Sequence, residues 1–436
     1  MRGTVRRIPV LALAAALAAA GAPPLTAAAE GDGARPPPLR DADAKTWGRA
    51  KKLLPIYLWA KGPGIRDVTR VDEVWRKEGH DALRLTKAQW RDLGSILRDG
   101  SPFTTEKSRG RTIRVATGEK GPDGTDETLP VRVSVTGEYE PGCGKSFPLV
   151  ITLHGGPMKD LKEAEAAAGT QFSAWNGQLS VLKGIVAAPA LTGERYGPRE
   201  RRFLRNLVEE LDRAYNVDRD RVLLTGHSWG GILTWHLGPP HADAFALLAP
   251  FVCAVNPGRP HLRNLRALPV YHVQGDRDIE WILRTGRERK EILDDLGYEH
   301  VYRELHGGHG LFGGELAPIA RYLLDRPRRM YAPEIVRCDE SGANDSDLWY
   351  WVRSPCRDFT ARLDRAANAV QVDIEEEEFE VLLADEMLDL DRPIRVRRGA
   401  RTVFEGKVER SLRFALDHVA ETGDRGRVFA ASVRVP

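Results

Sequence analysis

The sequence predicts an α/β fold: a doubly wound, mostly parallel sheet, preceded by a helical segment and followed by a small β-sandwich-like domain. Three observations lead to this prediction. Solid apolar runs recur between residues 147 and 305, and helix-like segments separate most of them. Residues 44–108 have helical periodicity instead, and the chain after residue 330 has the pattern of short strands and turns. Strands that alternate with helices form a parallel sheet covered on both faces.

The N-terminal residues have the features of a targeting segment. Three arginines within the first seven residues precede an apolar run, and Ala27 and Ala29 form the small-x-small pattern of a cleavage site. A retained membrane anchor is the alternative, but a glycine and two prolines interrupt the run, and no later stretch is apolar enough to span a bilayer. We therefore expect residues 1–29 to be a signal peptide and the mature protein to be secreted or periplasmic.

Charge and cysteine content exclude several classes of protein. The net charge of the whole chain is +3, but residues 1–29 carry three arginines and no acid, so the mature chain is near neutral and shows no sign of nucleic-acid binding. Four cysteines are too few for a disulfide-built scaffold. In an oxidising compartment Cys338 and Cys356 could form a disulfide, whereas Cys253 lies in an apolar run and is expected to be a buried thiol.

Composition and periodicity divide the chain into segments. Residues 30–43 are rich in Gly, Pro and charge and are expected to form a linker. In the helical segment, residues 44–108, Thr86 is a plausible N-cap and Gly100 a plausible stop. The stretch "LTKAQWRDLGSILRDG" places apolar residues at helix-like spacing, namely Leu85, Trp90, Leu93 and Leu97.

The catalytic domain is expected to span residues 109–330. Residues 111–119 and 130–139 alternate apolar and polar positions, as half-exposed antiparallel strands do, and residues 199–218 form an amphipathic helix. Ligands of parallel sheets bind at the carboxyl ends of the strands. The runs expected to be buried strands are 147–153, 184–190, 221–225, 245–252, 268–274 and 301–305.

Residues 331–436 are expected to form the β-rich domain. The segment "RRGAR" at 397–401 is a plausible hairpin turn between two strands. The aromatic cluster Trp349, Tyr350 and Trp351 has two interpretations, a sugar-stacking platform or, more commonly for such a cluster, core packing.

The stretch "LLTGHSWGGIL" at 223–233 contains the pattern G-x-S-x-G. Such a match is weak by itself, but here an apolar strand runs directly into Gly226 and a helix starts after Gly230, which is the strand–turn–helix context that a nucleophilic serine needs. Ser228 is therefore the candidate nucleophile. A serine hydroxyl also needs a histidine base, and the histidine needs an acid that selects its tautomer.

Both partners follow Ser228 in the order acid, then histidine, that a doubly wound sheet requires. Asp276 and Asp278 come after one expected strand, and His306 and His309 come after another. We favour Asp278, which the loop carries away from the strand end, and His309, which lies between two glycines. Asp276 and His306 remain the alternative acid and base.

An oxyanion hole is the remaining requirement. The backbone N–H of Trp229, the residue after the nucleophile, is the first expected donor. The second is expected from the segment "LHGGP" after an early strand; Pro157 has no N–H, so the donor is Gly155 or, preferably, Gly156. A plain Gly-Gly turn is the alternative. The two histidines of "HGGHG" have no third ligand at sensible spacing, and no metal or cofactor is expected.

Together these residues resemble the α/β-hydrolase superfamily. Within it, "FPLVITLHGGP", "YNVDRDRVLLTGHSWGG", "GDRD" and "GGHGLF" resemble the secreted esterases and polyhydroxyalkanoate-depolymerase-like serine hydrolases over about residues 110–326. The resemblance implies Ser228 as nucleophile, His309 as base and Asp278 as acid. The stretch "LDRPIRVRRGARTVFEGKV" more loosely resembles β-domains appended to such hydrolases. The chain lacks the third consecutive glycine of the H-G-G-G lipases, which argues against long-chain lipid substrates.

The leading hypothesis is a secreted serine hydrolase that cleaves carboxylic esters through an acyl-enzyme. The ester would be linked to a polysaccharide or belong to a small polyester, by analogy alone. One alternative is a prolyl-oligopeptidase-type serine peptidase, although the helical segment is too short for the β-propeller of those enzymes. The other is a non-catalytic protein that binds a glycan or a cell surface on a hydrolase scaffold.

Overall fold

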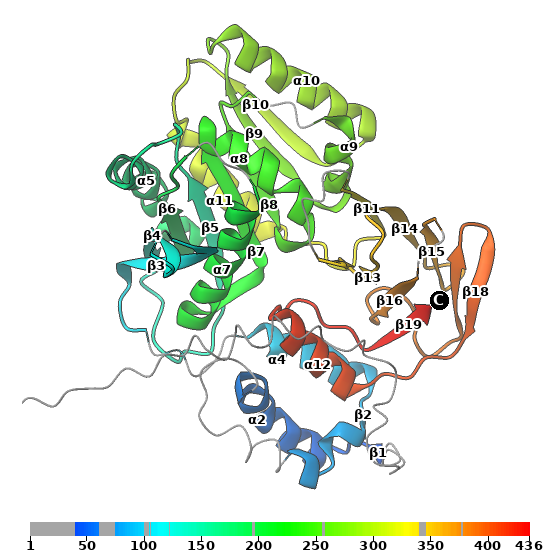
Figure 1. Cartoon of the computed structure of the whole chain (residues 1–436). Helices are drawn as coiled ribbons and strands as arrows, with labels where there is room; N and C mark the ends of the chain where they lie inside the picture. Colours follow the sequence, from blue (N-terminus) through cyan, green and yellow to red (C-terminus); the bar gives the residue numbers. More distant parts are fainter. Residues whose placement is uncertain are drawn as a thin grey trace, which may run out of the picture. The chain divides into compact units, whose positions relative to one another are not determined.

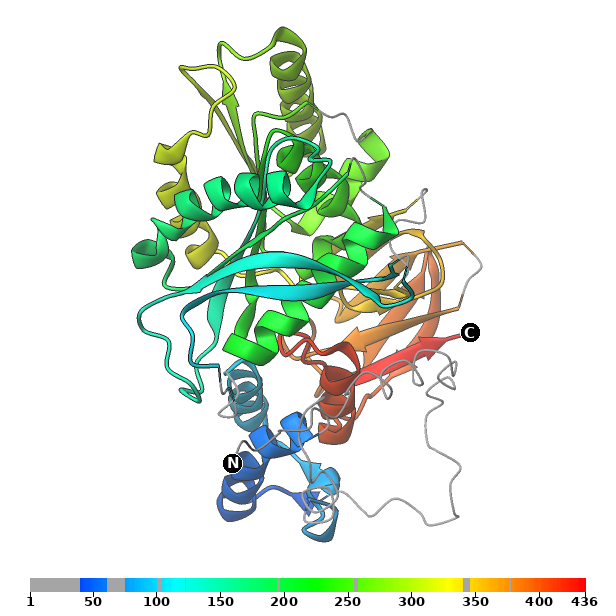
Figure 2. The same ribbon diagram turned by 60° about the vertical axis from the view of Figure 1, so that its left-hand side comes forward.

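An eight-stranded sheet organises residues 110–305 in the computed structural model of the protein (Figure 1). Its spatial order is β10-β9-β8-β7-β5-β6-β4-β3. The strands are β3 (Gly110–Lys120), β4 (Asp126–Val135), β5 (Phe147–Leu153), β6 (Ile185–Pro189), β7 (Val217–His227), β8 (Leu247–Phe251), β9 (Val270–Gly275) and β10 (His300–Leu305). Strands β5 to β10 pair in parallel, whereas β3 and β4 form a long antiparallel hairpin (Figure 2). The predicted doubly wound, mostly parallel sheet is confirmed.

The structure describes residues 40–60, 75–99, 104, 106–121, 123–193, 197–254, 258–339, 346–375 and 378–436. The expected signal peptide and most of the expected linker lie outside the described residues. Among the helices described, none combines the length and the apolar character needed to cross a membrane.

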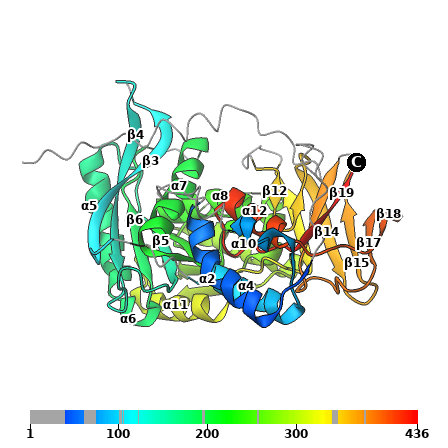
Figure 3. The ribbon, with the colours of Figure 1, turned by 90° about the horizontal axis from the view of Figure 1, so that it is seen from below.

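Helices cover both faces of the sheet because side chains alternate along each buried strand. Val150 of β5 shares a hydrophobic cluster with Trp175 and Ile319, whereas its neighbour Ile151 shares one with Phe203 and Leu233. Figure 3 shows helices on both sides of the strands. The sheet is therefore solid core on both sides. The helices around it are α5 (Leu161–Asn176), α6 (Leu179–Leu182), α7 (Pro198–Tyr215), α8 (Trp229–Leu237), α9 (Arg259–Leu262), α10 (Glu280–Leu296) and α11 (Leu316–Asp325).

The winding of the chain reverses at β5. From β5 the chain crosses through α5 to β6 on one side, and it then returns through α7 to β7 on the other side. Leu153 at the end of β5 pairs with Gly226 near the end of β7. The segments that follow β5 and β7 therefore leave the sheet side by side, at the kind of switch point where doubly wound sheets form their sites.

The described residues before β3 contain the helices α2 (Ala44–Ala60) and α4 (Lys87–Arg98) and the short parallel strands β1 (Arg40–Asp41) and β2 (Leu83–Arg84). Thr86 caps α4 as predicted, in a capping box with Gln89. The helix ends at Arg98, just before the predicted stop. No β-propeller lies within residues 40–60 and 75–99.

Two further sheets follow the hydrolase-like core. One has five strands in the order β11-β14-β15-β17-β18, and the other has four strands in the order β12-β13-β16-β19. These sheets confirm the predicted C-terminal β-region, and the β17–β18 hairpin turns at the predicted "RRGAR". The strands are β11 (Glu334–Cys338), β12 (Leu348–Trp349), β13 (Val352–Arg353), β14 (Asp358–Asp364), β15 (Ala369–Asp373), β16 (Phe379–Leu383), β17 (Ile394–Arg398), β18 (Arg401–Gly406) and β19 (Ala431–Val435). The helix α12 (Leu412–Thr422) was not predicted.

The aromatic cluster of this region is core rather than a sugar platform. Trp349, Tyr350 and Trp351 are each at most 1% exposed. The indole nitrogens of both tryptophans donate to buried backbone carbonyls, of Val336 and Ala332 respectively. Stacking of a sugar needs an exposed ring face, so this interpretation is wrong for the cluster.

The suggested disulfide is also wrong. In the antiparallel register of β11 and β14, the residue opposite Cys338 is Asp358. Cys356 lies two residues before that position, so the two cysteines are not opposite each other. Cys356 keeps a free thiol, whose Sγ lies 3.2 Å from the carbonyl oxygen of Asp358. Cys253 is a buried thiol as predicted, and burial raises its pKa to about 11.

Buried arginines join the C-terminal segment to the hydrolase-like core. Arg328, after α11, donates to Asp424 at 2.6 Å and to Asp220 at 3.0 Å, and its side chain is 1% exposed. Burial alone would raise the pKa of the Asp424 carboxyl, but the charges of Arg328, Arg219 and Arg427 outweigh it and hold the pKa well below the ordinary value. The Asp424 carboxylate therefore stays charged inside the fold.

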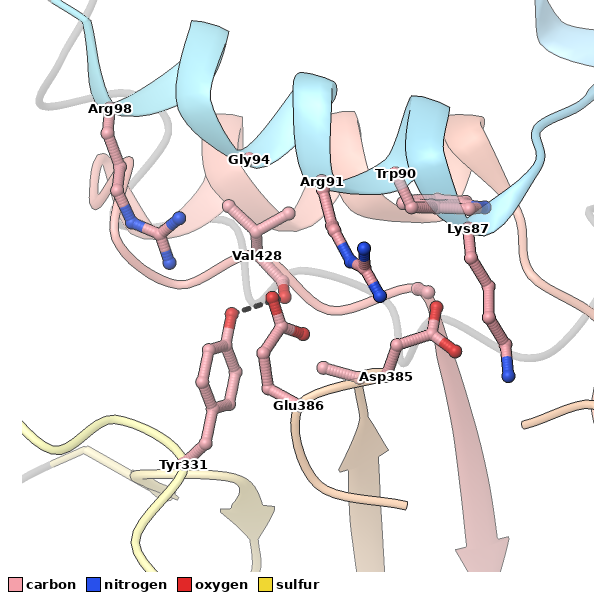
Figure 4. A pocket seen from close by; sticks show the side chains of 11 residues that line it. Lys87, Trp90, Arg91, Gly94, Arg98, Tyr331, Asp385, Glu386 and Val428 are labelled. Carbon is pink, nitrogen blue, oxygen red and sulfur yellow. Dashed lines mark hydrogen bonds between the residues drawn. The ribbon is translucent and has the colours of Figure 1, made fainter. Parts of the chain in front are cut away.

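A cavity of about 310 Å³ lies where α4 meets the C-terminal region. Figure 4 shows Arg91 of α4 extending toward Asp385 and Glu386, while Tyr331 donates to the carbonyl of Val428 at 2.7 Å. None of its lining residues belongs to the loops after β7, β9 and β10. The cavity is therefore separate from the site described below.

We predict that Arg328→Met lowers the free energy of unfolding by about 3–5 kcal/mol, because it leaves buried carboxylates without their main partner. Urea denaturation of the purified protein measures this. Arg329→Met is the matched control, since the neighbouring Arg329 is 43% exposed and pairs with Glu299 at the surface. The control is expected to cost less than about 1 kcal/mol, and equal losses in the two variants would contradict the prediction.

We predict that the buried His418, on α12, makes the folded protein less stable in acid. Burial, together with the charges of Arg427 and Arg353, lowers its pKa from 6.5 to about 3. Between these values the unfolded chain binds a proton that the folded chain refuses, so unfolding becomes easier as pH falls, by up to about 1.4 kcal/mol per pH unit. His418→Phe keeps an aromatic ring beside Phe414 and Phe429. Denaturation between pH 7 and 4 should show a shallower decline for this variant; parallel curves would refute the assignment.

Candidate active site

Ser228 occupies a tight turn between β7 and α8. Its backbone angles are φ 54° and ψ −112°, a conformation that is strained for any residue with a side chain. Hydrogen bonds on both sides hold it: the N–H of Ser228 donates to the carbonyl of Phe251 at 2.9 Å, and its carbonyl accepts from Ile232 at 3.0 Å. The strain is thus maintained by β8 on one side and by the first turn of α8 on the other.

The glycines of the motif make this turn possible. A Cβ on Gly226 would lie 2.3 Å from the carbonyl carbon of Gly230, and a Cβ on Gly230 would lie 2.2 Å from the carbonyl oxygen of Leu153. No side chain fits at either position. The N-terminus of α8 is thereby packed directly on the ends of β5 and β7, and its positive dipole end lies at the serine.

Ser228, His309 and Asp278 form a continuous hydrogen-bonded chain. Nε2 of His309 lies 2.7 Å from Oγ of Ser228, and its Nδ1 lies 2.9 Å from Oδ1 of Asp278. The Asp278 side chain is fully covered, whereas that of His309 is 34% exposed. The loops after β7, β9 and β10 supply one member each, so the structure brings together the three side chains favoured from the sequence.

Two more groups hold the Asp278 carboxylate. The backbone N–H of Ile279 donates to Oδ1 at 2.7 Å, and the side-chain amide of Gln274, on β9, donates to Oδ2 at 3.1 Å. Gln274 is completely buried. Sequence reasoning missed Gln274; its signal was a polar residue inside the otherwise apolar strand "LPVYHVQG".

The alternative acid and base pair with each other instead of with Ser228. Nδ1 of His306 lies 3.2 Å from Oδ2 of Asp276, and Oδ1 of Asp276 accepts from the N–H of Gly307 at 2.9 Å. The Gly307 N–H and the His306 ring lower the pKa of the Asp276 carboxyl. Asp276 thus ties the loop after β9 to the loop after β10, which carries His309.

A buried polar cluster lies behind Gln274. The Arg289 guanidinium is fully buried, donates to the carbonyl of Cys253 at 2.6 Å and lies over the ring of Trp235, 5.1 Å from its centre. Among the described residues, Nε and Nη1 of Arg289 and Oε1 of Gln274 have no hydrogen-bond partner. A Cβ on Gly286 would lie 3.3 Å from that amide oxygen, so α10 packs closely here.

The H-G-G segment after β5 lies beside the nucleophile. A Cβ on Gly155 would be 3.4 Å from the Cβ of Ser228, and Gly156 has a left-handed φ of 78°. Nε2 of His154 accepts from the N–H of Leu191 at 3.1 Å, which fixes the segment to the chain after β6. Burial lowers the pKa of His154, in keeping with a neutral ring that accepts this bond.

His227 packs against His309 and carries no charge near neutral pH. The His227 ring lies edge to face with the His309 ring, 5.4 Å between centres, and burial lowers the pKa of His227, so it stays neutral near pH 7. Within the described ranges, no cluster of three or more His, Cys, Asp or Glu side chains could hold a metal ion.

This arrangement can move one proton. A hydroxyl that shares a hydrogen bond with a neutral imidazole can transfer its proton to the ring as it attacks an electrophilic carbon. A carboxylate on the opposite ring nitrogen selects the tautomer and stabilises the imidazolium that forms. Ser228, His309 and Asp278 stand in this order at hydrogen-bonding distances.

Comparisons with known proteins find two relatives that are named as esterases. No protein-family model matches the chain. "Putative esterase NocK" of Nocardia uniformis subsp. tsuyamanensis is 30% identical over 144 residues, 32% of this chain and 42% of the relative. "Bifunctional acetylxylan esterase/xylanase XynS20E" of Neocallimastix patriciarum is 29% identical over 87 residues, 20% of this chain and 13% of the relative. The chain thus spans less than half the length of either protein.

A thermostable esterase of known structure is 21% identical, with a TM-score of 0.41 over 50% of this chain and 64% of its own. The chain's own sheet has a strained serine after β7 at the switch point, and an acid and a histidine after β9 and β10. This topology is that of the α/β-hydrolase fold, and both sequence relatives are named as esterases.

Proposed function

We propose that the protein is a serine hydrolase that cleaves carboxylic esters through an acyl-enzyme. The observation that carries the proposal is the hydrogen-bonded chain from Ser228 through His309 to Asp278, at 2.7 and 2.9 Å. Each member follows a different parallel strand, so the three meet only in the folded protein. Both relatives are named as esterases, which favours an ester over other acyl substrates.

In the first half of the reaction, Oγ of Ser228 attacks the ester carbonyl carbon while Nε2 of His309 takes the hydroxyl proton. The tetrahedral intermediate collapses, the bond to the alcohol oxygen breaks, and His309 passes the proton to the leaving alcohol. Water then attacks the acyl-serine with the same base, and the acid product leaves with Ser228 restored. Asp278 stays ionised throughout and orients the ring.

The negative oxygen of each intermediate needs donors that are already in place. We propose the backbone N–H groups of Trp229 and Gly156 for this role. The position of Trp229 at the first turn of α8 and the contact of the neighbouring Gly155 with Ser228 support the proposal. The reaction uses no metal or organic cofactor.

The substrate is proposed to be a polymer-linked ester, on a polysaccharide or within a polyester. The name of the relative from Neocallimastix patriciarum includes acetylxylan, an acetylated polysaccharide. A prolyl-oligopeptidase-type peptidase uses the same catalytic groups and is the second candidate. The helices described before β3 do not supply the propeller that those enzymes place there. A non-catalytic binding protein would not need the three side chains to be aligned.

We also propose that the enzyme acts outside the cytoplasm. This rests on the arginines, the apolar run and the Ala27-x-Ala29 site of residues 1–29. Sequencing the N-terminus of protein recovered from the periplasm or the medium tests it: a mature chain that begins near Glu30 is expected, and an uncut chain retained in the cytoplasm would refute export.

We predict that Ser228→Ala lowers kcat on p-nitrophenyl acetate by about a millionfold, the loss expected when a triad nucleophile is removed. His309→Ala should lose activity to a similar extent. His306→Ala is the matched control, because His306 contacts Asp276 and not Ser228. If His306→Ala abolishes turnover and His309→Ala does not, the alternative base is the correct one. Measurable turnover by Ser228→Ala at the wild-type rate would overturn the proposed function.

We predict a positioning role for Gln274. Gln274→Met removes the donor to Asp278 with little change in side-chain length, and kcat should fall by up to about a hundredfold through misplacement of the acid and the ring. With one donor lost, the Asp278 charge stabilises the His309 imidazolium more strongly, so the acidic limb of the kcat/KM profile should move to higher pH. A loss of stability with an unshifted pH profile would indicate a purely structural residue.

A further inference from the structure

Two exposed apolar side chains directly follow the candidate acid. Ile279 and Trp281 are 54% and 52% exposed, and they are the exposed large hydrophobic residues among the residues that the structure describes. Single exposed apolar residues are common on protein surfaces. What distinguishes this pair is its place, because the backbone N–H of Ile279 donates to Asp278 itself.

The fold fixes both residues close to the reacting groups. Ile279 is the N-cap of α10 and Trp281 is the second residue of that helix. Trp281 is the third residue after Asp278, so their Cα atoms are at most about 11 Å apart. The contact of Ile279 with the carboxylate, and the helix that starts there, prevent this segment from shifting without moving the acid.

The loop that carries His309 leaves the surface beside it open. A Cβ on Gly310, Gly313 or Gly314 would meet no atom within 4 Å, and the His309 side chain is one-third exposed. The space beside these three glycines is therefore free to admit part of a large substrate next to the histidine. Small-molecule sites, in contrast, are usually enclosed.

The proposed reaction places the alcohol portion of the ester on the His309 side of Ser228. His309 gives its proton to the leaving alcohol, so the alcohol oxygen must come within hydrogen-bond distance of Nε2. The alcohol portion of the ester therefore lies on the His309 side of Ser228, and whatever that alcohol is attached to extends past the histidine and its acid, where Ile279 and Trp281 are exposed.

We propose that Trp281, with Ile279 beside it, binds the alcohol portion of the ester, and that this alcohol is a sugar residue of a polysaccharide. The inference rests on the proposed function and deepens it by choosing one of the two polymer classes. A pyranose ring has flat C–H faces that pack on an indole and a rim of hydroxyl groups that needs polar partners.

The surroundings of Trp281 favour a sugar over a polyester. Exposed polar side chains of Arg277, Glu280 and Arg284 stand next to the two apolar residues in the sequence and can meet hydroxyl groups. A polyester surface has few donors and would be bound best by a wide apolar patch, whereas the described residues offer two exposed large hydrophobic side chains here.

The test keeps the acyl group constant and changes the alcohol. Acetyl release is measured from ethyl acetate and from acetylated xylan, for the wild type and for Trp281→Ala. We expect kcat/KM on acetylated xylan to fall about tenfold, the value of losing one well-packed aromatic contact, and kcat/KM on ethyl acetate to change less than twofold. Trp281→Tyr, which keeps a flat ring, should retain most of the activity on xylan.

Glu291→Ala is the matched control, since Glu291 is exposed on the same helix about three turns away, and it should change neither rate. Equal losses on both substrates, or no loss on either, would overturn the proposal. So would a loss confined to a dispersed polyester, which would assign the surface to that polymer instead.

Failure of the proposed function has a different signature. In that case the wild type does not release acetate from ethyl acetate or p-nitrophenol from p-nitrophenyl acetate, or Ser228→Ala releases them equally well. If both small esters are hydrolysed in a Ser228-dependent manner and only the Trp281 comparison fails, then the chemistry stands and the polysaccharide assignment falls.

Discussion

The contact between Gly226 and Gly230 is the constraint on which the candidate site depends. Because neither position can hold a side chain, α8 begins within van der Waals contact of β5 and β7, and Ser228 is forced into a backbone conformation that a serine would not adopt freely. The strain is offset by the surrounding parallel strands, whose ends Leu153 and Gly226 are in register. The conformation of Ser228, the candidate nucleophile, is thus a consequence of sheet packing, and any substitution that separates α8 from β5 would remove it.

The buried strands and the three candidate side chains, Ser228, Asp278 and His309, could be predicted from the sequence. Buried parallel strands have a distinctive pattern, and their carboxyl ends define one edge of the sheet, so Asp278 and His309 could be placed near Ser228 although 31 and 81 residues separate His309 from these two partners. The choice of Asp278 over Asp276 followed from loop length, and the structure pairs Asp276 with His306 instead. Both pairs follow the same two strands, so periodicity alone could not separate them.

Features that depend on side-chain packing could not be predicted in this way. Gln274 contacts Asp278 because a polar residue of β9 is turned toward the acid, and the contact depends on the strand register and the path of the loop. The partners of Arg328 lie 96 and 108 residues away. The helix α12 was within reach of sequence reasoning, since Leu412, Ala415, Leu416 and Val419 are buried at helical spacing, but the strands around it suggested a purely β-rich region.

The candidate acid and the candidate base differ in exposure: the Asp278 side chain is covered, and the His309 side chain is partly exposed. Full coverage of Asp278, with Gln274 and Ile279 as donors, keeps the carboxylate in one orientation and shields it from competing water. The His309 side chain is instead one-third exposed, as the proposed transfer of its proton to a leaving alcohol requires. A fixed acid below an accessible base suits an enzyme whose substrate is too large to be enclosed. Ile279 combines two features of this site: its backbone N–H donates to Asp278, and its side chain is 54% exposed. The residue after the candidate acid is therefore both a structural donor and a part of the surface.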